Sequence, residues 1–116
     1  MSELEKLADK KDKFILDKDK NVIPANLLEW SEYLENHRED RIVKQEVVNG
    51  HKVSTVFLGL IHSYDESKLD IFETMVFAGE KGGQDIYCDR YDTWKEAEEG
   101  HEKAVQWVKN GCKDEE

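Results

Sequence analysis

The sequence predicts an α+β domain: a mostly antiparallel sheet of about four strands, in the order β-α-β-β-β-α, with two main helices packed on it. Three observations predict this class. Asn49 and Gly50 separate two runs rich in β-branched residues, which is typical of a two-residue hairpin turn. Residues 24–37 and 93–110 repeat apolar side chains at helical spacing, over more residues than a strand usually has. The short apolar run 70–77 fits one further strand.

Length and composition indicate one domain with charged flanks. The chain has 116 residues, of which 38% are hydrophobic and 38% charged, and aromatic and β-branched residues are plentiful between Phe14 and Val108. We therefore expect a single folded domain at 13–111. Residues 1–12 are expected to be a charged segment or a short helix, and residues 112–116 an acidic, disordered tail.

The domain is expected to begin with a short strand and an amphipathic helix. Residues 13–17 are predicted as the strand, and the polar residues after them as a turn. Pro24 is expected in the first turn of a helix that runs to His37, because the N–H that proline lacks has no helical partner there. The buried side of this helix is predicted to consist of large apolar side chains, namely Leu27, Leu28, Trp30 and Leu34.

The middle of the chain is predicted to form most of the sheet. Strands are expected at 41–48, 51–61 and 70–77, with a short extended segment at 86–88. The second strand is apolar on both faces from Val53 onward, so we expect it to be central. Gly59 is expected to mark a bulge or a close approach of another segment.

The last helix is predicted at 93–110. Thr93 and Glu96 have the spacing of a capping box, and Gly111 is a typical residue just past the end of a helix. Small residues on its buried side would let the helix lie close to the sheet. The residues expected on that side are Trp94, Ala97, His101, Ala104, Val105 and Val108.

The charge of the chain narrows the classes of partner. A net charge of −10 disfavours direct binding of nucleic acid and favours partners with a basic surface. The acidic run on the last helix is interrupted by Lys95 and Lys103, which disfavours imitation of DNA phosphates. The longest apolar run is too short to span a membrane. Because a secretory signal is not evident, we expect a cytoplasmic protein with reduced cysteines.

Three sequence blocks carry a resemblance to a family. They are "VSTVFLGLIH" (53–62), "FETMVF" (72–77) and "RYDTWKEAEEGH" (90–101). Together they resemble a family of small proteins encoded in tailed-phage and prophage genomes. The resemblance carries over no functional residues. It implies an accessory protein made in the cytoplasm of a bacterial host, of a kind that often inhibits a host enzyme or a host defence protein.

Glu73 is the most unusual residue of the predicted sheet, because it stands in an otherwise apolar row with Ile71, Met75 and Phe77. An ionised carboxylate on such a face is costly unless it is paired. Three arrangements would accommodate Glu73. It pairs with a cation; it lies on an open face where a partner binds; or it is a site acid with a raised pKa. The cations considered are Arg41, Lys44, His62 and Arg90.

Two further groups of residues are candidates for a site. His62 and His101 could converge with Glu73 into an acid–base or metal site, although a histidine on the buried stripe of a helix is more often a core residue. The histidines and cysteines lack metal-ligand spacing, so no metal and no cofactor is predicted. Arg90, Tyr91 and Trp94 are either an interface hot spot or a hydrophobic lid over the last helix.

The number of helices leads to a functional prediction. Two helices cover one face of a small sheet, so the other face must meet the N-terminal segment, a second copy of the chain or another protein. We therefore predict a non-enzymatic phage accessory protein that binds and inhibits a host protein, and that forms a homodimer or higher oligomer. The alternatives are a homo-oligomeric protein that sequesters a nucleotide, and a small enzyme using His62 and Glu73. The candidate binding residues are Glu73, His62, Arg90, Tyr91, Trp94 and His101.

Overall fold

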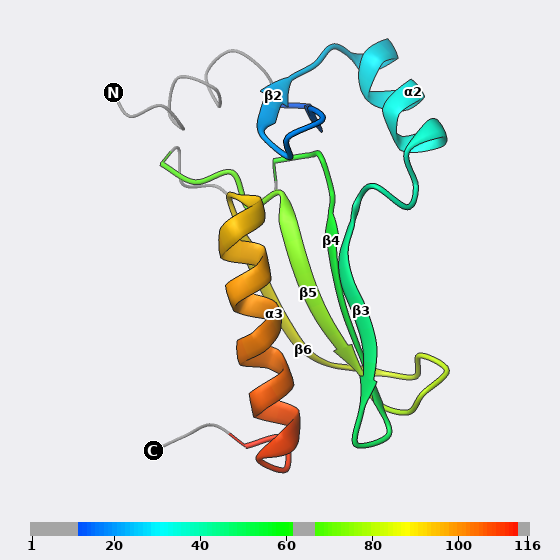
Figure 1. The fold of residues 1–116 in the computed structure, drawn as a ribbon, viewed down its shortest axis with the longest axis vertical. Coiled ribbons are helices and arrows are strands. Elements are labelled where there is room, and N and C mark those ends of the chain that lie inside the picture. Colours follow the sequence, from blue (N-terminus) through cyan, green and yellow to red (C-terminus); the bar gives the residue numbers. More distant parts are fainter. Residues whose placement is uncertain (1–11, 62–66, 114–116) are drawn as a thin grey trace.

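The computed structural model describes residues 12–61 and 67–113 and confirms the α+β class. Figure 1 shows a four-stranded sheet with one long helix along it, and a smaller group of elements at one end. The expectations for the N-terminal segment and the acidic tail fall mostly on residues 1–11 and 114–116, outside the described residues. The elements are β1 (Phe14–Leu16), β2 (Val22–Pro24), α2 (Leu27–Asn36), β3 (Ile42–Val48), β4 (His51–Phe57), β5 (Phe72–Phe77), β6 (Asp85–Tyr91) and α3 (Trp94–Lys109).

The main sheet is an antiparallel meander in the order β3-β4-β5-β6. Because side chains alternate along a strand, register divides the sheet into two rows of residues. The face under α3, which we call the covered face, includes Glu46, Val48, Val53, Thr55, Phe57, Phe72, Thr74, Val76, Tyr87 and Tyr91. The opposite face, which we call the open face, includes Gln45, Val47, Lys52, Ser54, Val56, Glu73, Met75, Phe77, Cys88 and Arg90.

Helix α3 closes the core of the covered face as the sequence predicts. Its N-cap is Thr93, whose side chain accepts a hydrogen bond from the backbone N–H of Glu96 at 3.1 Å. Gly111 follows the helix with a φ of 78°, which fits its predicted position past the helix end. The predicted stripe is confirmed, with Gly100 added to it. The buried residues of α3 are Ala97, Gly100, His101, Ala104, Val105 and Val108.

The β3–β4 hairpin is confirmed, but β4 is shorter than expected. Asn49 and Gly50 both have positive φ, 47° and 79°, as a type I′ turn requires. β4 ends at Phe57 instead of residue 61 because the chain turns at Gly59, which has a φ of 79°. A side chain at Gly59 would lie 2.7 Å from Trp30 Nε1 and 2.9 Å from the Phe14 carbonyl oxygen. The predicted close approach is therefore present.

The N-terminal elements differ from the prediction. β1 pairs with β2 in a separate two-stranded sheet, with Phe14 opposite Pro24, so Pro24 ends a strand and does not open a helix. The helix begins after Asn26, because Asn26 and Glu29 form a reciprocal capping box with bonds of 2.8 and 2.9 Å. We call β1, β2 and α2 the end block.

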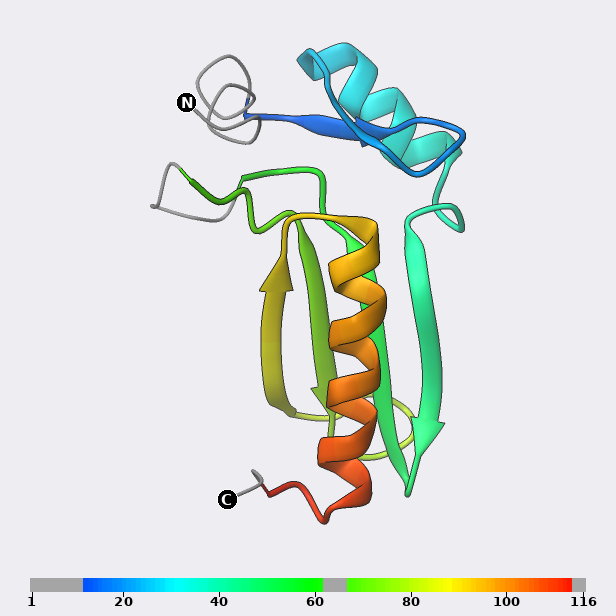
Figure 2. The ribbon, with the colours of Figure 1, turned by 60° about the vertical axis from the view of Figure 1, so that its left-hand side comes forward.

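Helix α2 packs in the end block and not on a face of the main sheet. Tyr33 is its buried residue and meets Phe57, at the end of β4, edge to face with ring centres 6.1 Å apart. Leu27 and Leu28, expected to be buried, are 63% and 67% exposed. Their positions are turned away because Trp30, Tyr33 and Leu34 face the core instead. Figure 2 shows α3 alone in front of the sheet, with the end block above it.

The fourth strand of the main sheet is β6, where only a short extended segment at 86–88 is expected from the sequence. β6 pairs with β5 along its full length, from Asp85 opposite Phe77 to Tyr91 opposite Phe72. Its charged, alternating sequence hides this role. None of the described helices is long and apolar enough to cross a membrane.

Candidate functional site

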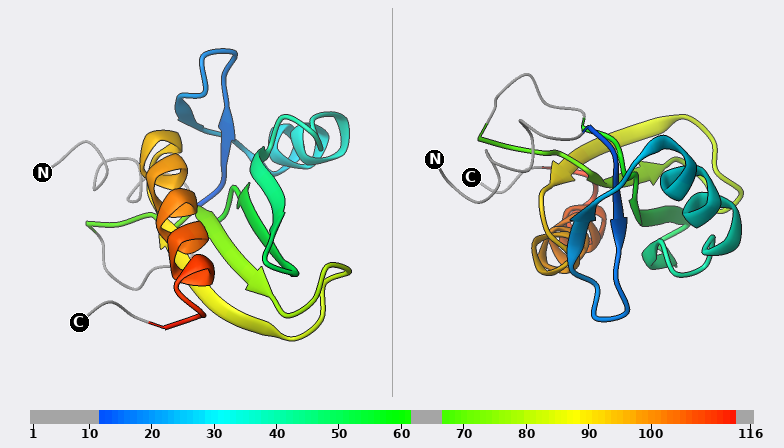
Figure 3. Two further views of the ribbon diagram at one scale, coloured as in Figure 1. Left: turned by 60° about the horizontal axis from the view of Figure 1, so that its bottom comes forward. Right: turned by 90° about the horizontal axis from the view of Figure 1, so that it is seen from above.

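The open face of the main sheet is the candidate site. Among the described residues no helix or strand lies over it, and the end-on view in Figure 3 shows α3 on the other side of the sheet. Several of its apolar side chains are exposed to solvent: Val47 at 51% and Ile42 at 36%, with Ile86 at 38% near its margin. Val56, Met75 and Phe77 are partly buried between them. An uncovered sheet face of this composition is typical of a surface that meets another molecule.

Glu73 lies near the β6 side of the open face and is paired. Its carboxylate accepts a hydrogen bond from Arg90 Nε at 3.0 Å, and the two residues are direct partners in the β5–β6 register. The Glu73 side chain is 17% exposed and that of Arg90 is 40% exposed. The first of the three expected arrangements is therefore present: Glu73 pairs with a cation, Arg90, on the face that α3 leaves uncovered.

Cys88 lies beside this ion pair and is poorly suited to be a nucleophile. Its thiol donates a long hydrogen bond, 3.6 Å, to the Glu73 carboxylate. Desolvation, followed by the charge of Glu73, raises the pKa of the Cys88 thiol, so that the unreactive protonated form is favoured.

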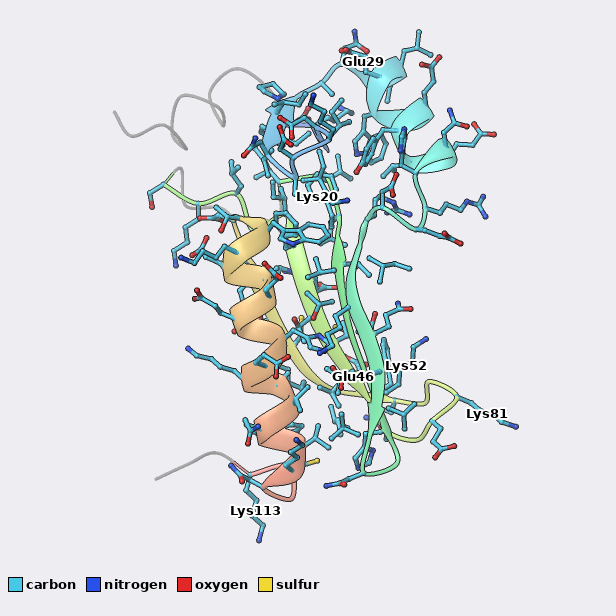
Figure 4. All side chains as sticks on the ribbon, in the orientation of Figure 1. Lys20, Glu29, Glu46, Lys52, Lys81 and Lys113 are labelled. Atoms are coloured by element: carbon cyan, nitrogen blue, oxygen red, sulfur yellow. The ribbon has the colours of Figure 1, made fainter. Side chains whose placement is uncertain are left out.

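The remaining polar groups make the open face nearly neutral. Gln45 donates to the Ser54 hydroxyl at 2.8 Å, which joins β3 to β4. Lys52 of β4, labelled in Figure 4, contributes one further positive charge to this face. The open face thus carries Lys52 and Arg90 against Glu73, in a chain whose net charge is −10. Most of the acidic residues lie elsewhere on the molecule.

A chain of hydrogen bonds crosses the covered face below α3. His101 is fully buried, with Nε2 at 2.7 Å from a Glu46 carboxylate oxygen and Nδ1 at 2.7 Å from the Thr55 hydroxyl. The Thr55 hydroxyl lies 2.5 Å from that of Thr74. The hydrogen bond from His101 is the main cause that lowers the pKa of Glu46. Because a carboxylate only accepts, the hydrogen of the imidazole lies on Nε2.

This acid–imidazole–hydroxyl series has the order of groups found in nucleophilic catalysis. Thr55, Thr74 and His101 are nevertheless 0% exposed, so a substrate has no access to the hydroxyl. Of the two alternatives for His101, a core histidine or a member of an acid–base or metal site, the structure supports the hydrogen-bonded core histidine. Glu46, Thr55 and Thr74 are absent from the predicted site, although the alternation of β4 and β5 places both threonines in one row.

The predicted cluster of Arg90, Tyr91 and Trp94 is divided between the two faces. Arg90 lies on the open face, whereas Tyr91, the next residue of β6, lies under α3. Trp94 packs edge to face on Phe72, with Lys20 of the end block 4.9 Å above its ring. For Tyr91 and Trp94 the structure supports the hydrophobic lid.

Tyr91 is held directly against the backbone of α3. Its ring and hydroxyl fill the space where a side chain at position 100 would stand. Among the described residues the buried hydroxyl makes no well-formed hydrogen bond, although Thr74 lies close to it. Desolvation raises the pKa of Tyr91 well above its ordinary value.

The structure does not bring the predicted acid–base set together. Glu73 and His101 lie on opposite faces of the sheet, and His62 lies outside the described residues. Within 12–61 and 67–113, no three His, Cys, Asp or Glu residues gather as metal ligands would.

A groove beside β6, not expected from the sequence, lies on the α3 side of the sheet. Its volume is about 510 Å³, and its floor contains Tyr87 and Trp107, whose ring centres are 5.0 Å apart. Polar side chains of α3 surround the aromatic pair, namely Glu99, Lys103 and Gln106. The groove is hard to predict from the sequence, because Tyr87 lies beside Trp107 only when residues 85–91 form a full strand.

Comparison with protein-family models, with curated protein sequences and with solved structures gives no match.

Proposed function

We propose that this chain is a non-enzymatic binding protein that docks its open face on a host protein and inhibits it. The observation that supports the proposal is the uncovered sheet face, where partly buried Val56 and Met75 lie beside the Glu73–Arg90 ion pair and Val47 and Ile42 are exposed. A hydrogen-bonded charge pair within an apolar surface gives an interface specificity as well as contact area. The resemblance of three blocks to phage and prophage proteins favours a host target.

The two alternative functions receive less support from the arrangement of the same residues. A nucleotide site would need Arg90 and Tyr91 on one surface, but they point to opposite faces of the sheet. An enzyme based on Glu73 would need an acid able to exchange protons, whereas this carboxylate is bound to the Arg90 guanidinium at 3.0 Å.

The experiment that tests the proposal places a photoreactive amino acid on the open face in bacterial cells. Val47 is the position of choice, because it belongs to the open face and, at 51%, is its most exposed apolar side chain among the residues named above. The matched control position is Glu98, an exposed residue of α3 on the other side of the molecule. We expect irradiation to link one host protein to the Val47 variant and not to the Glu98 variant.

Each outcome separates the functions. A host protein linked at Val47, whose activity falls when purified wild-type chain is added, supports inhibition through the open face. Links only between two copies of the chain would show that the open face is a homodimer interface. Equal labelling from Val47 and Glu98 would contradict the proposal.

A further inference from the structure

β6 is an edge strand without lysine or proline, two residues that discourage pairing at an edge. Among the described residues it ends the sheet, so one side of its backbone has no strand partner. Its sequence, DIYCDRY, contains neither lysine nor proline, and the five residues other than Tyr87 and Tyr91 are exposed. Edge strands without such protection are the sites where extended peptides add to a sheet.

The opposite edge, β3, is less suited to accept a strand. Its pairing with β4 is irregular between Ile42 and Lys44. Lys44 reaches Glu102 of α3 at 3.3 Å, and Glu46 is bound to His101. Because the register of β6 is also irregular, opposite Val76 and Phe77, the lysine is what distinguishes β3 from β6 as an edge.

The groove lies directly beside the β6 edge, where an added strand would place every second side chain. Tyr87 belongs both to β6 and to the floor of the groove, with Trp107 behind it. The alternate side chains of the same strand would lie over the open face, next to Cys88 and Arg90. One extended segment would therefore contact both surfaces at once.

The charges around this edge indicate the chemistry of the segment. Asp85 and Asp89 are exposed on β6, and Glu99 lines the groove, whereas the one arginine of the strand is bound to Glu73. Glu102 also lines the groove, and Lys103 and Lys113 offset part of this negative charge. Together with the net charge of −10, the surroundings favour a basic peptide over an acidic one.

We propose that the partner docks by adding an extended, basic segment to the outer edge of β6, with alternate side chains in the Tyr87–Trp107 groove and on the open face. This inference rests on the proposed function, because it specifies how a partner protein would engage the sheet. Backbone hydrogen bonds would supply the general affinity, and the groove would select the side chain next to Tyr87.

The test uses an eight-residue peptide that alternates arginine and valine as the probe. Residue-resolved amide hydrogen exchange is measured on the full chain with and without the peptide. We expect alternate amides of β6 to exchange at least about tenfold more slowly with the peptide, while the amides of β3 do not change. Two control peptides, one with glutamate in place of arginine and one with prolines at two central valines, should give no protection.

Substitutions on the chain provide the second part of the test. Asp89→Lys should weaken binding of the probe about tenfold, because it reverses a charge and introduces a lysine on the edge. Glu98→Lys makes the same change of charge on α3, away from the groove, and should leave binding within about twofold. Unfolding curves of both variants establish that they are folded.

The outcomes separate this inference from the proposed function. Absence of β6 protection, or equal protection by the glutamate peptide, would overturn strand addition. Photolinking of a host protein at Val47 that Asp89→Lys leaves unchanged would also overturn it, while the proposed function stands. Protection of β6 by the probe, with no host protein linked at Val47, would support strand addition and contradict docking on the open face.

Discussion

The two faces of the main sheet are built from alternate residues of the same strands, yet they have opposite characters. On the covered face Val53, Phe72 and Val76 are 0% exposed, and the polar groups Thr55 and His101 are hydrogen-bonded to one another. On the open face the apolar residues range from partly buried Val56 and Met75 to Val47 at 51% exposure, and the main polar contact, Glu73–Arg90, reaches solvent. The comparison teaches that apolar alternation selects the strands, whereas the packing of α3 decides which row becomes the core.

The same difference determines what a substitution should do. Residues of the covered face are expected to affect stability, because their contacts form on folding. Residues of the open face are expected to affect binding and to leave stability almost unchanged. A pair of variants, one on each face, therefore tests the comparison directly.

The largest expected difference is between two phenylalanines of β5. Phe72→Ala should lower the free energy of unfolding by about 3–5 kcal/mol, because it leaves a cavity between Phe57 and Trp94. Phe77→Ala, on the open face, should lower it by only about 1 kcal/mol. Urea unfolding followed by tryptophan fluorescence measures both, and equal losses would show that the open face is buried in solution.

The contact between Gly100 and Tyr91 should give the next largest effect. Alanine favours a helix over glycine by about 1 kcal/mol, but a side chain at position 100 would collide with the Tyr91 ring. Gly100→Ala should therefore destabilise the protein by about 1–3 kcal/mol. The cost should shrink when Gly100→Ala is made in a Tyr91→Ala background. Stabilisation by the single change would contradict the close packing of α3 on β6.

The Glu46–His101 pair predicts a pH-dependent effect. The pKa of Glu46 is lowered in the folded state, so its contribution is complete above the ordinary value of 4.5 and is lost as the pH falls through the lowered pKa. Glu46→Gln should cost about 1–2 kcal/mol at pH 7, and its difference from wild type should close as the solution becomes more acidic than pH 4.5. Chemical unfolding across pH measures it. Glu98→Gln, at an exposed position of α3, serves as control, and an equal effect there would show that the effect of Glu46→Gln does not depend on the buried histidine.

The smallest effect on stability is expected at Glu73. Because Arg90 is 40% exposed, Glu73→Ala should change the free energy of unfolding by less than about 1 kcal/mol. Photolinking at Val47 should fall in the same variant if the open face binds a partner. A double-mutant cycle with Arg90→Ala measures the pair. A large loss of stability would place Glu73 in the core and end the comparison between the faces.

Much of the fold follows from local patterns. The Asn49-Gly50 turn, the stripe of α3 and the pairing of Glu73 with Arg90 are all present as expected. The start of α2 is not, because the signal of Pro24 competes with the capping box of Asn26, and the capping box determines the helix. The strand that pairs with β1 is also not predicted, because β2 has only three residues and is too short to show an alternation of apolar and polar side chains.

The candidate site is less predictable than the fold. Arg90, Tyr91 and Trp94 are close in sequence, but the alternation of a strand separates the first two onto opposite faces. That separation can be read from the sequence only if β6 is recognised as a strand. The buried hydrogen bonds of His101 are long-range in sequence: Glu46 is 55 positions away and Thr55 is 46 positions away. No local pattern of the sequence therefore predicts them.

The meander order of the sheet also affects how the chain is made. Each of the strands β3 to β6 pairs only with its neighbour in sequence, so the sheet can assemble while translation continues. The covered face nevertheless stays bare until the ribosome has added the 16 residues of α3, which takes about one to three seconds at ordinary rates of synthesis. During that interval both faces of the sheet are exposed. A chain truncated before Trp94 should therefore expose the apolar row of the covered face and aggregate more readily than the full chain.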